Sequence, residues 1–160
     1  MKDQDGSYRA ERVVDAPRAR VFEALTTLEG LAGWWTPAVS GSSGERGQIV
    51  LAFDEQRLMM RVDSAVAPES VRWTCTEHTR FPEWRGTILA FDLRERGDDT
   101  TVLRFRHGGL VPDLQCFSVC RRGWDHYLSS LCDEAAGRGG NPYGSEAHAR
   151  ISPTAQLRAT

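Results

Sequence analysis

The sequence contains no long apolar run and no cluster of like charges. No apolar stretch approaches the length of about 18 residues that a membrane-spanning helix needs, and the first residues lack the apolar core of a secretory signal. The 20 basic and 22 acidic residues leave a net charge of −2 without a basic block, so the electrostatic footprint of a nucleic-acid-binding protein is missing. We therefore expect a cytoplasmic protein that neither inserts into a membrane nor binds nucleic acid.

Recognisable catalytic templates are also missing. Residues 41–44 lack the spacing of a nucleophile elbow, and the glycines at 137–140 lack the lysine and hydroxyl residue that complete a phosphate-binding loop. Asp63, Asp92 and Glu95 fall on the charged side of their strands, so no carboxylate pair is placed inward. These absences favour a binding protein over an enzyme and give no reason to expect a cofactor.

The four cysteines are expected to be reduced in a cytoplasmic protein. Cys116 and Cys120 share one face of a predicted helix, and Cys75 is followed three residues later by His78. Such soft pairs can bind a metal, but the two-plus-two spacing of a zinc site is absent, and helical cysteines more often act as small buried hydrophobes. We expect no metal site.

Aromatic residues are abundant instead. The 160 residues include five Trp, six Phe and three Tyr. A chain of this length is expected to fold as one domain that buries roughly 70% of its unfolded surface. Aromatic side chains bring a large buried area with little flexibility, so they suit either a packed core or the walls of an apolar cavity.

Apolar and polar residues alternate along much of the chain, which predicts antiparallel strands with one wet face. Strands are expected over Tyr8–Val14 and through four or five segments between positions 49 and 107. The residues that share the inward faces are Ile49, Leu51, Phe53, Leu58, Met60, Val62, Val71, Trp73, Cys75, Thr87, Leu89, Phe91, Leu93, Leu103, Phe105 and His107.

Helical patterns lie on both sides of this series. Asp15 is predicted to cap a short helix that ends near Thr26, and a second short helix spans 28–35. An amphipathic helix is expected from Pro112–Asp113 to about Ala136. Its apolar stripe consists of Phe117, Cys120, Trp124, Leu128, Leu131 and Ala135. The predicted fold class is therefore α+β, a curved antiparallel sheet around a long C-terminal helix with two short helices closing one end.

Residues 1–136 are expected to form the domain, and residues 137–160 a C-terminal tail without periodicity. The tail is either mobile or packed as an arm against the domain or a partner. If it is ordered, Tyr143 and Ile151 are its expected anchors, and it can pack across a dimer. The chain is expected to be a monomer or a homodimer.

A set of short motifs resembles a known superfamily. The motifs are Ala16-Pro17 followed by Val21-Phe22, then Trp34-Trp35, Trp84-Arg85-Gly86-Thr87, His107-Gly108-Gly109-Leu110, and Gly123-Trp124 with Leu128 and Leu131. Their order and spacing over residues 8–136 resemble the START-like (SRPBCC) superfamily, in particular the branch similar to the activator of the heat-shock-protein ATPase. The resemblance implies a helix-grip fold with a hydrophobic pocket between the sheet and the final helix. It implies no one activity, because the superfamily includes lipid carriers, polyketide cyclases, co-chaperones and antibiotic-protection proteins.

The inward positions predict either the wall of a ligand pocket or a filled core. The candidate wall residues are Trp35, Phe53, Met60, Trp73, Leu89, Phe91, Phe105 and Trp124. His107 is the polar candidate, because an imidazole on an apolar wall can orient a ligand carbonyl or phenol, or act as an acid or base, with Thr87 and Tyr127 as helpers. The alternative for His107 is a structural histidine that is hydrogen-bonded at the end of its strand.

Arg12 is a further candidate. It shares the parity of Tyr8, Ala10 and Val14 in the first predicted strand. If this side faces inward, the guanidinium group needs an acidic partner or a ligand anion, and a buried ion pair is the favoured outcome. If Val13 faces inward instead, Arg12 lies in solvent.

We therefore expect a protein that binds or sequesters a small hydrophobic molecule, such as a lipid or a polyketide-like natural product, including self-protection in a producing organism. The alternative is a cyclase or dehydratase that uses His107 as its acid/base group. An interaction module that activates a chaperone ATPase ranks lowest, because the outward strand faces are rich in Arg and Asp.

Overall fold

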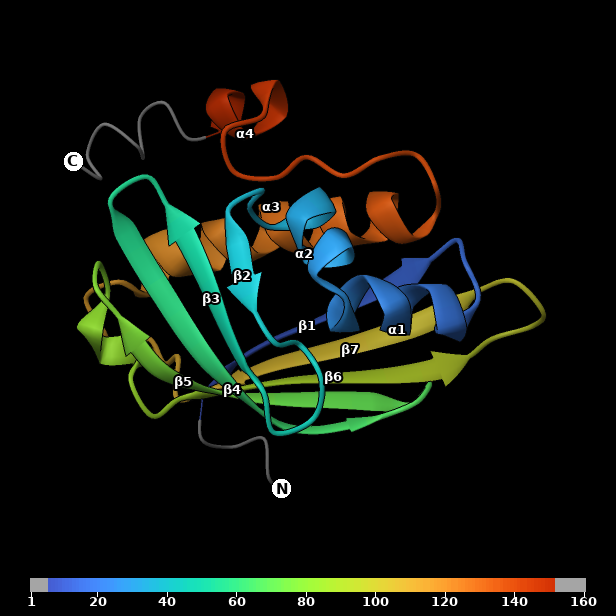
Figure 1. Ribbon diagram of the computed structural model, residues 1–160, viewed down its shortest axis with the longest axis horizontal. Coiled ribbons are helices and arrows are strands. Elements are labelled where there is room, and N and C mark those ends of the chain that lie inside the picture. The colour runs from blue at the N-terminus through green and yellow to red at the C-terminus, as the bar shows by residue number, and fades with distance from the viewer. Residues whose placement is uncertain (1–5, 152–160) are drawn as a thin grey trace.

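The computed structural model describes residues 6–151 and has an α+β fold around one curved sheet (Figure 1). Seven antiparallel strands follow the order β1-β7-β6-β5-β4-β3-β2. The strands are β1 (Tyr8–Val14), β2 (Val39–Gly41), β3 (Gln48–Phe53), β4 (Gln56–Val66), β5 (Ser70–His78), β6 (Ile88–Glu95) and β7 (Thr101–Gly108). The helices are α1 (Arg18–Thr26), α2 (Leu28–Trp34), the 3₁₀ helix η2 (Pro82–Trp84), α3 (Phe117–Ala135) and α4 (Glu146–Ile151).

The sheet bends so that β3 and β4 rise steeply from β6 and β7, and α3 lies in the resulting grip (Figure 1). Two register shifts in the β4–β5 pair, at Met59/Met60 and Val62/Ser64, accompany this bend. Such irregularities increase the local twist and curvature of a strand pair. The predicted fold class is confirmed, and α1 and α2 pack on the same side of the sheet as α3.

The strands bury one face and expose the other. In β6, Leu89, Phe91 and Leu93 are buried, whereas Asp92 and Arg94 are exposed. All of the residues predicted to face inward are buried, with the exception of Phe53, which is half-buried. The predicted apolar stripe of α3 also faces the sheet. No helix in residues 6–151 has the length and apolarity needed to cross a membrane.

Two helices begin later than predicted. α1 begins at Arg18, its N-cap position is Pro17, and no side chain caps it, so the prediction that Asp15 is the cap is wrong. α3 begins at Phe117 rather than at Pro112–Asp113, because the residues between form hydrogen-bonded turns first. In both cases local propensity marked the region of the helix start but not its first residue.

The junction of α1 and α2 positions the tryptophans above the sheet. Thr27 caps α2, because its Oγ1 accepts a hydrogen bond from the N–H of Gly30 at 2.9 Å. A Cβ on Gly30 would lie 2.7 Å from backbone atoms of Ala24, so the missing side chain lets the two helices approach closely. The Trp34 indole N–H donates to the Ala24 carbonyl at 2.8 Å. These contacts place Trp34 and Trp35 over the core.

Gly30→Ala should lower the free energy of unfolding by about 1–3 kcal/mol, because the added methyl group overlaps the α1 backbone. Gly123→Ala is the matched control, since Gly123 lies inside α3 and a Cβ there meets no atom within 4 Å. The control should raise stability by about 0.5–1 kcal/mol through helix propensity. Urea unfolding of both variants measures these changes, and an unchanged midpoint for Gly30→Ala would contradict the close contact of α1 and α2.

Candidate functional site

Aromatic rings form a continuous layer between the sheet and α3. Trp35, which follows α2, lies 5.9 Å from Trp73 of β5 and 5.4 Å from Trp124 of α3, measured between ring centroids. Trp73 meets Phe91 at 5.0 Å, Phe91 meets Phe105 at 4.9 Å, and Phe105 meets Trp124 at 4.4 Å. None of the five side chains is more than 2% exposed. Folding therefore brings five of the predicted wall residues together as one contiguous group of rings.

The remaining apolar candidates divide into two groups. Met60 and Leu89 are fully buried in the same core cluster. Phe53 lies apart, at the end of β3, where its ring meets that of Tyr143 edge-on at 5.2 Å. Phe53 therefore belongs to the cover of the core rather than to the layer of rings.

His107 is held by hydrogen bonds on both ring nitrogens. The Trp124 indole N–H donates to Nδ1 at 3.0 Å, and Nε2 lies 2.9 Å from Oγ1 of Thr87. Because the Thr87 hydroxyl donates to the Trp84 carbonyl, Nε2 carries the proton and donates to Thr87. Burial, and then the charge of nearby His78, lower the pKa of His107 from 6.5 to about 3. The imidazole is thus neutral near pH 7, and neither nitrogen is free for a ligand in this arrangement.

Acidification should destabilise the fold through His107. The unfolded chain binds a proton at a pKa near 6.5 and the folded chain only near 3, so the stability that neutral His107 contributes is complete above pH 6.5 and is lost as the pH falls toward 3. His78 acts in the same direction, since burial, followed by the charge of Arg80, lowers its pKa to about 4. We expect a loss of about 1.4 kcal/mol per pH unit for each histidine in this window.

The measurement is urea unfolding followed by circular dichroism between about pH 7 and 4. His107→Gln removes one titrating group. As the pH is lowered, its free energy of unfolding should therefore fall less steeply than that of the wild type, by the slope that corresponds to the uptake of about one proton. Equal slopes for the two proteins would contradict a buried, neutral His107.

Arg12 faces the helix side of β1 but lies at its margin. Its guanidinium Nη2 is 3.4 Å from Oδ1 of Asp125 on α3, and the Tyr8 hydroxyl donates to the same oxygen at 2.9 Å. The Arg12 and Asp125 side chains are 29% and 51% exposed, and Val13 is 57% exposed. The expected ion pair therefore exists, but the prediction that it is buried is wrong. Burial and then the bond to Asp125 raise the pKa of Tyr8 to about 12.

The four cysteines are free thiols, and three of them, Cys75, Cys116 and Cys120, are buried in the fold. Cys120 accepts a hydrogen bond from the Trp84 indole at 3.2 Å, and burial raises the pKa of its thiol. Burial also raises the pKa of Cys75 to about 12. Within residues 6–151 no three His, Cys, Asp or Glu side chains are grouped so that they could hold a metal ion.

Residues 137–151, which we call the C-terminal arm, fold back over α2 and α3 and end in α4 (Figure 1). The Tyr143 N–H donates to the Trp35 carbonyl at 2.7 Å, and the Tyr143 hydroxyl donates to Oδ2 of Asp54 at 2.7 Å. Tyr143 thus joins the arm to the aromatic layer and to the β3–β4 turn. The side chain of Ile151, the other expected anchor, lies outside what the structure describes, as do residues 152–160.

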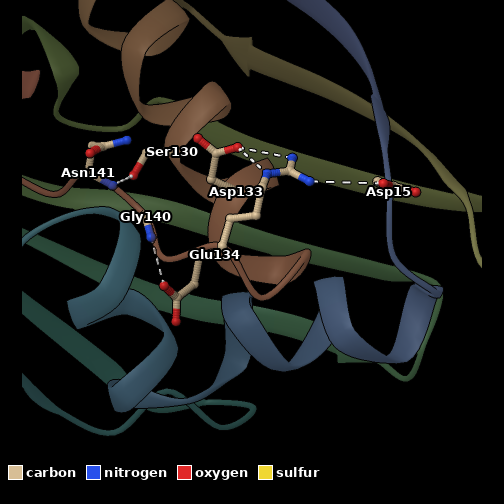
Figure 2. Close-up of polar contacts among 7 residues, drawn as sticks. Asp15, Ser130, Asp133, Glu134, Gly140 and Asn141 are labelled. Atoms are coloured by element: carbon tan, nitrogen blue, oxygen red, sulfur yellow. Dashed lines mark hydrogen bonds and ion pairs between the residues drawn. The ribbon is translucent and has the colours of Figure 1, made fainter.

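The start of the arm is tied to α3 by polar groups that the sequence analysis did not single out (Figure 2). The buried Ser130 hydroxyl donates to the Trp34 carbonyl at 2.8 Å and accepts from the Asn141 N–H at 2.6 Å. One turn later, Oε1 of Glu134 accepts from the Gly140 N–H at 3.0 Å. Ser130 and Glu134 are four residues apart beside the apolar stripe of α3, and this spacing is the signal that could have indicated a bound segment.

Tyr143→Ala should loosen the arm, because it removes both the bond to Asp54 and the ring contact with Phe53. Tyr143→Phe is the matched control, which keeps the ring and loses only the partly exposed hydroxyl bond. Amide hydrogen exchange over residues 137–151 should increase at least tenfold in the alanine variant and about twofold or less in the phenylalanine variant. Equal exchange in all three proteins would contradict the anchoring role of Tyr143.

A depression of about 600 Å³ lies elsewhere on the molecule, between α1 and the charged side of β6 and β7. Its lining includes Arg18, Glu69, Asp92, Arg94, Glu95 and Arg104. Opposite charges alternate around it, with Arg18 3.8 Å from Glu95. Its chemistry is therefore that of a solvated surface, unlike the aromatic layer.

Comparison with known proteins agrees with this architecture. The family described as Activator of Hsp90 ATPase homolog 1-like protein matches residues 15–136. The chain belongs to this family. The match includes α1 through α3 and stops where the C-terminal arm begins. No curated protein sequence matches the chain.

Solved structures share the fold. The Aha1 dimer from Colwellia psychrerythraea is 25% identical, with a TM-score of 0.72 over 82% of this chain and 97% of that chain. CalU16 from Micromonospora echinospora is 21% identical, with a TM-score of 0.67 over 94% of this chain and 82% of that chain. DynU16, a protein of the dynemicin biosynthetic locus, is 17% identical, with a TM-score of 0.59 over 83% of this chain and 46% of that chain.

Proposed function

We propose that this family member binds or sequesters a small planar hydrophobic molecule between the sheet and α3. The observation that carries the proposal is the continuous layer of buried rings from Trp35 to Phe105, which is covered at Trp35 by a terminal arm. The C-terminal arm is held in place by a few local contacts and not by strand pairing. It can therefore move away from Trp35 without unfolding the sheet. A ligand enters when Trp35 and the arm move together.

Apolar burial supplies the affinity of such a site. A planar aromatic molecule that buries about 200 Å² gains about 5 kcal/mol before the costs of association are subtracted. The fold shared with DynU16, a putative protein in the dynemicin biosynthetic locus, supports a polyketide-like ligand. Self-protection of the producing cell is the role that we propose for such binding. This role needs tight, reversible burial and no catalytic group.

The proposal is tested by ¹⁹F NMR of protein that carries 5-fluorotryptophan at all five tryptophans, titrated with the uncharged probe N-phenyl-1-naphthylamine. Saturable binding of one probe should shift the resonances of Trp35, Trp73 and Trp124 most, because these rings line the layer. Trp34 stacks on Trp35 at 5.0 Å and should shift with it, whereas Trp84, whose ring contacts Trp124 at 6.0 Å and whose indole N–H is bonded to Cys120, should shift least and serves as the internal control. The absence of any saturable shift, or equal shifts at all five positions, would count against an interior site.

Two other functions have less support. A cyclase or dehydratase that uses His107 would need a free imidazole nitrogen, whereas Trp124 and Thr87 engage both nitrogens.

Activation of a chaperone ATPase is favoured by the family description and by the similarity to the Aha1 dimer. Such an activity would use an outer surface, where the exposed large apolar side chains Val13, Val66, Ile88 and Val119 lie one each on β1, β4, β6 and α3. ATP hydrolysis by Hsp90 with and without the protein distinguishes it from ligand binding.

A further inference from the structure

We propose that the indole N–H of Trp73 is the recognition group of the interior site, and that the ligand is an uncharged planar molecule with a carbonyl or phenol oxygen. This inference rests on the proposed function, because it names the ligand chemistry of the same site. In this proposal Trp73 donates a hydrogen bond to the ligand in addition to packing against it.

Trp73 lies at the middle of β5, in the centre of the sheet. Its backbone pairs with Val62 of β4 and Leu89 of β6, and its side chain is fully buried. The ring stacks on Trp35 at an interplanar angle of 22° and meets Phe91 edge-on at 66°. Neither of these two neighbouring rings carries an oxygen acceptor, and the paired residues Val62 and Leu89 have aliphatic side chains.

The Trp73 Nε1 atom is buried, and no residue among 6–151 accepts a hydrogen bond from it. The same group in three other tryptophans has a partner: Trp34 donates to a carbonyl, Trp84 to a thiol and Trp124 to an imidazole. A buried donor without an acceptor is costly, and native structures contain few of them. A phenylalanine would supply a buried aromatic ring without this cost, so the exception at Trp73 points to an acceptor that the ligand brings.

The charge of the ligand follows from the rest of the core. No Asp, Glu, Lys or Arg side chain is among the buried residues of the described range. The buried polar groups nearest the layer, His107 and Thr87, are already bonded to each other and to Trp124 and Trp84. A charged ligand would therefore lose its hydration without gaining a counter-charge, which is far more costly than burying one neutral oxygen that is hydrogen-bonded.

The test compares 9-fluorenone with fluorene, two rigid tricyclic molecules of nearly the same shape that differ by one carbonyl oxygen. Dissociation constants are measured by tryptophan fluorescence quenching. The wild type should bind fluorenone about five- to tenfold more tightly than fluorene, as expected for one buried hydrogen bond. In Trp73→Phe the smaller ring should weaken the binding of both compounds, and the preference for fluorenone over fluorene should disappear. Trp84→Phe is the matched control, which removes an indole N–H that already has a partner and should keep the preference.

A second measurement needs no variant to fold. In ¹H–¹⁵N spectra of the wild-type protein, fluorenone but not fluorene should move the Trp73 indole N–H resonance downfield and slow its exchange with solvent.

Equal affinities for the two compounds, together with an unmoved Trp73 resonance, would overturn the role of Trp73 and leave interior binding intact. If neither compound binds and N-phenyl-1-naphthylamine also shifts no tryptophan resonance, both the role of Trp73 and the proposed function are wrong.

Discussion

The contact of Trp124 with β7 is the interaction on which the rest of the structure depends. Its ring packs 4.4 Å from Phe105 and 5.4 Å from Trp35, and its indole N–H bonds to His107. One side chain thus joins α3 to the sheet and to the end of α2. Because it combines a large buried area with a directed hydrogen bond, the contact sets both the distance and the rotation of α3. That rotation turns Asp125 toward β1 and presents Ser130 to the C-terminal arm.

The interior is neutral as a consequence of how its polar groups are paired. Burial keeps His107 uncharged, and its two nitrogens complete a chain of hydrogen bonds from Trp124 through Thr87 to the backbone of Trp84. The charged pairs of the described chain lie at its surface or its margins, where water screens them. Within this neutral layer Trp73 stands out, because its donor is buried without an acceptor in the described chain. The chemistry that this core can offer a ligand is therefore apolar burial with one hydrogen bond.

Much of the architecture could be predicted because it depends on local periodicity. Alternation along β6 places Leu89 and Phe91 inside, and the 3.6-residue period of α3 places Trp124 on the sheet side. The exact starts of α1 and α3 could not be predicted, since turns compete with the first helical residues. Phe53 obeys the alternation but lies at a strand end, where it is only half-buried and packs against both the edge of the core and Tyr143 of the C-terminal arm. Periodicity gives the face of a residue and not its depth in the fold.

The sequence by itself determined the fold class, the inward faces of strands and helix, and the supply of aromatic rings, because each follows from the spacing of neighbouring residues. Only the tertiary structure decided which polar groups meet. His107 and Thr87 are 20 residues apart, and Arg12 and Asp125 are 113 apart, so no local pattern relates the members of either pair. The same holds for the arm, whose Tyr143 reaches Asp54 across 89 residues. Hydrogen-bond partners depend on the distance and direction between atoms, and these exist only once the sheet has closed around α3.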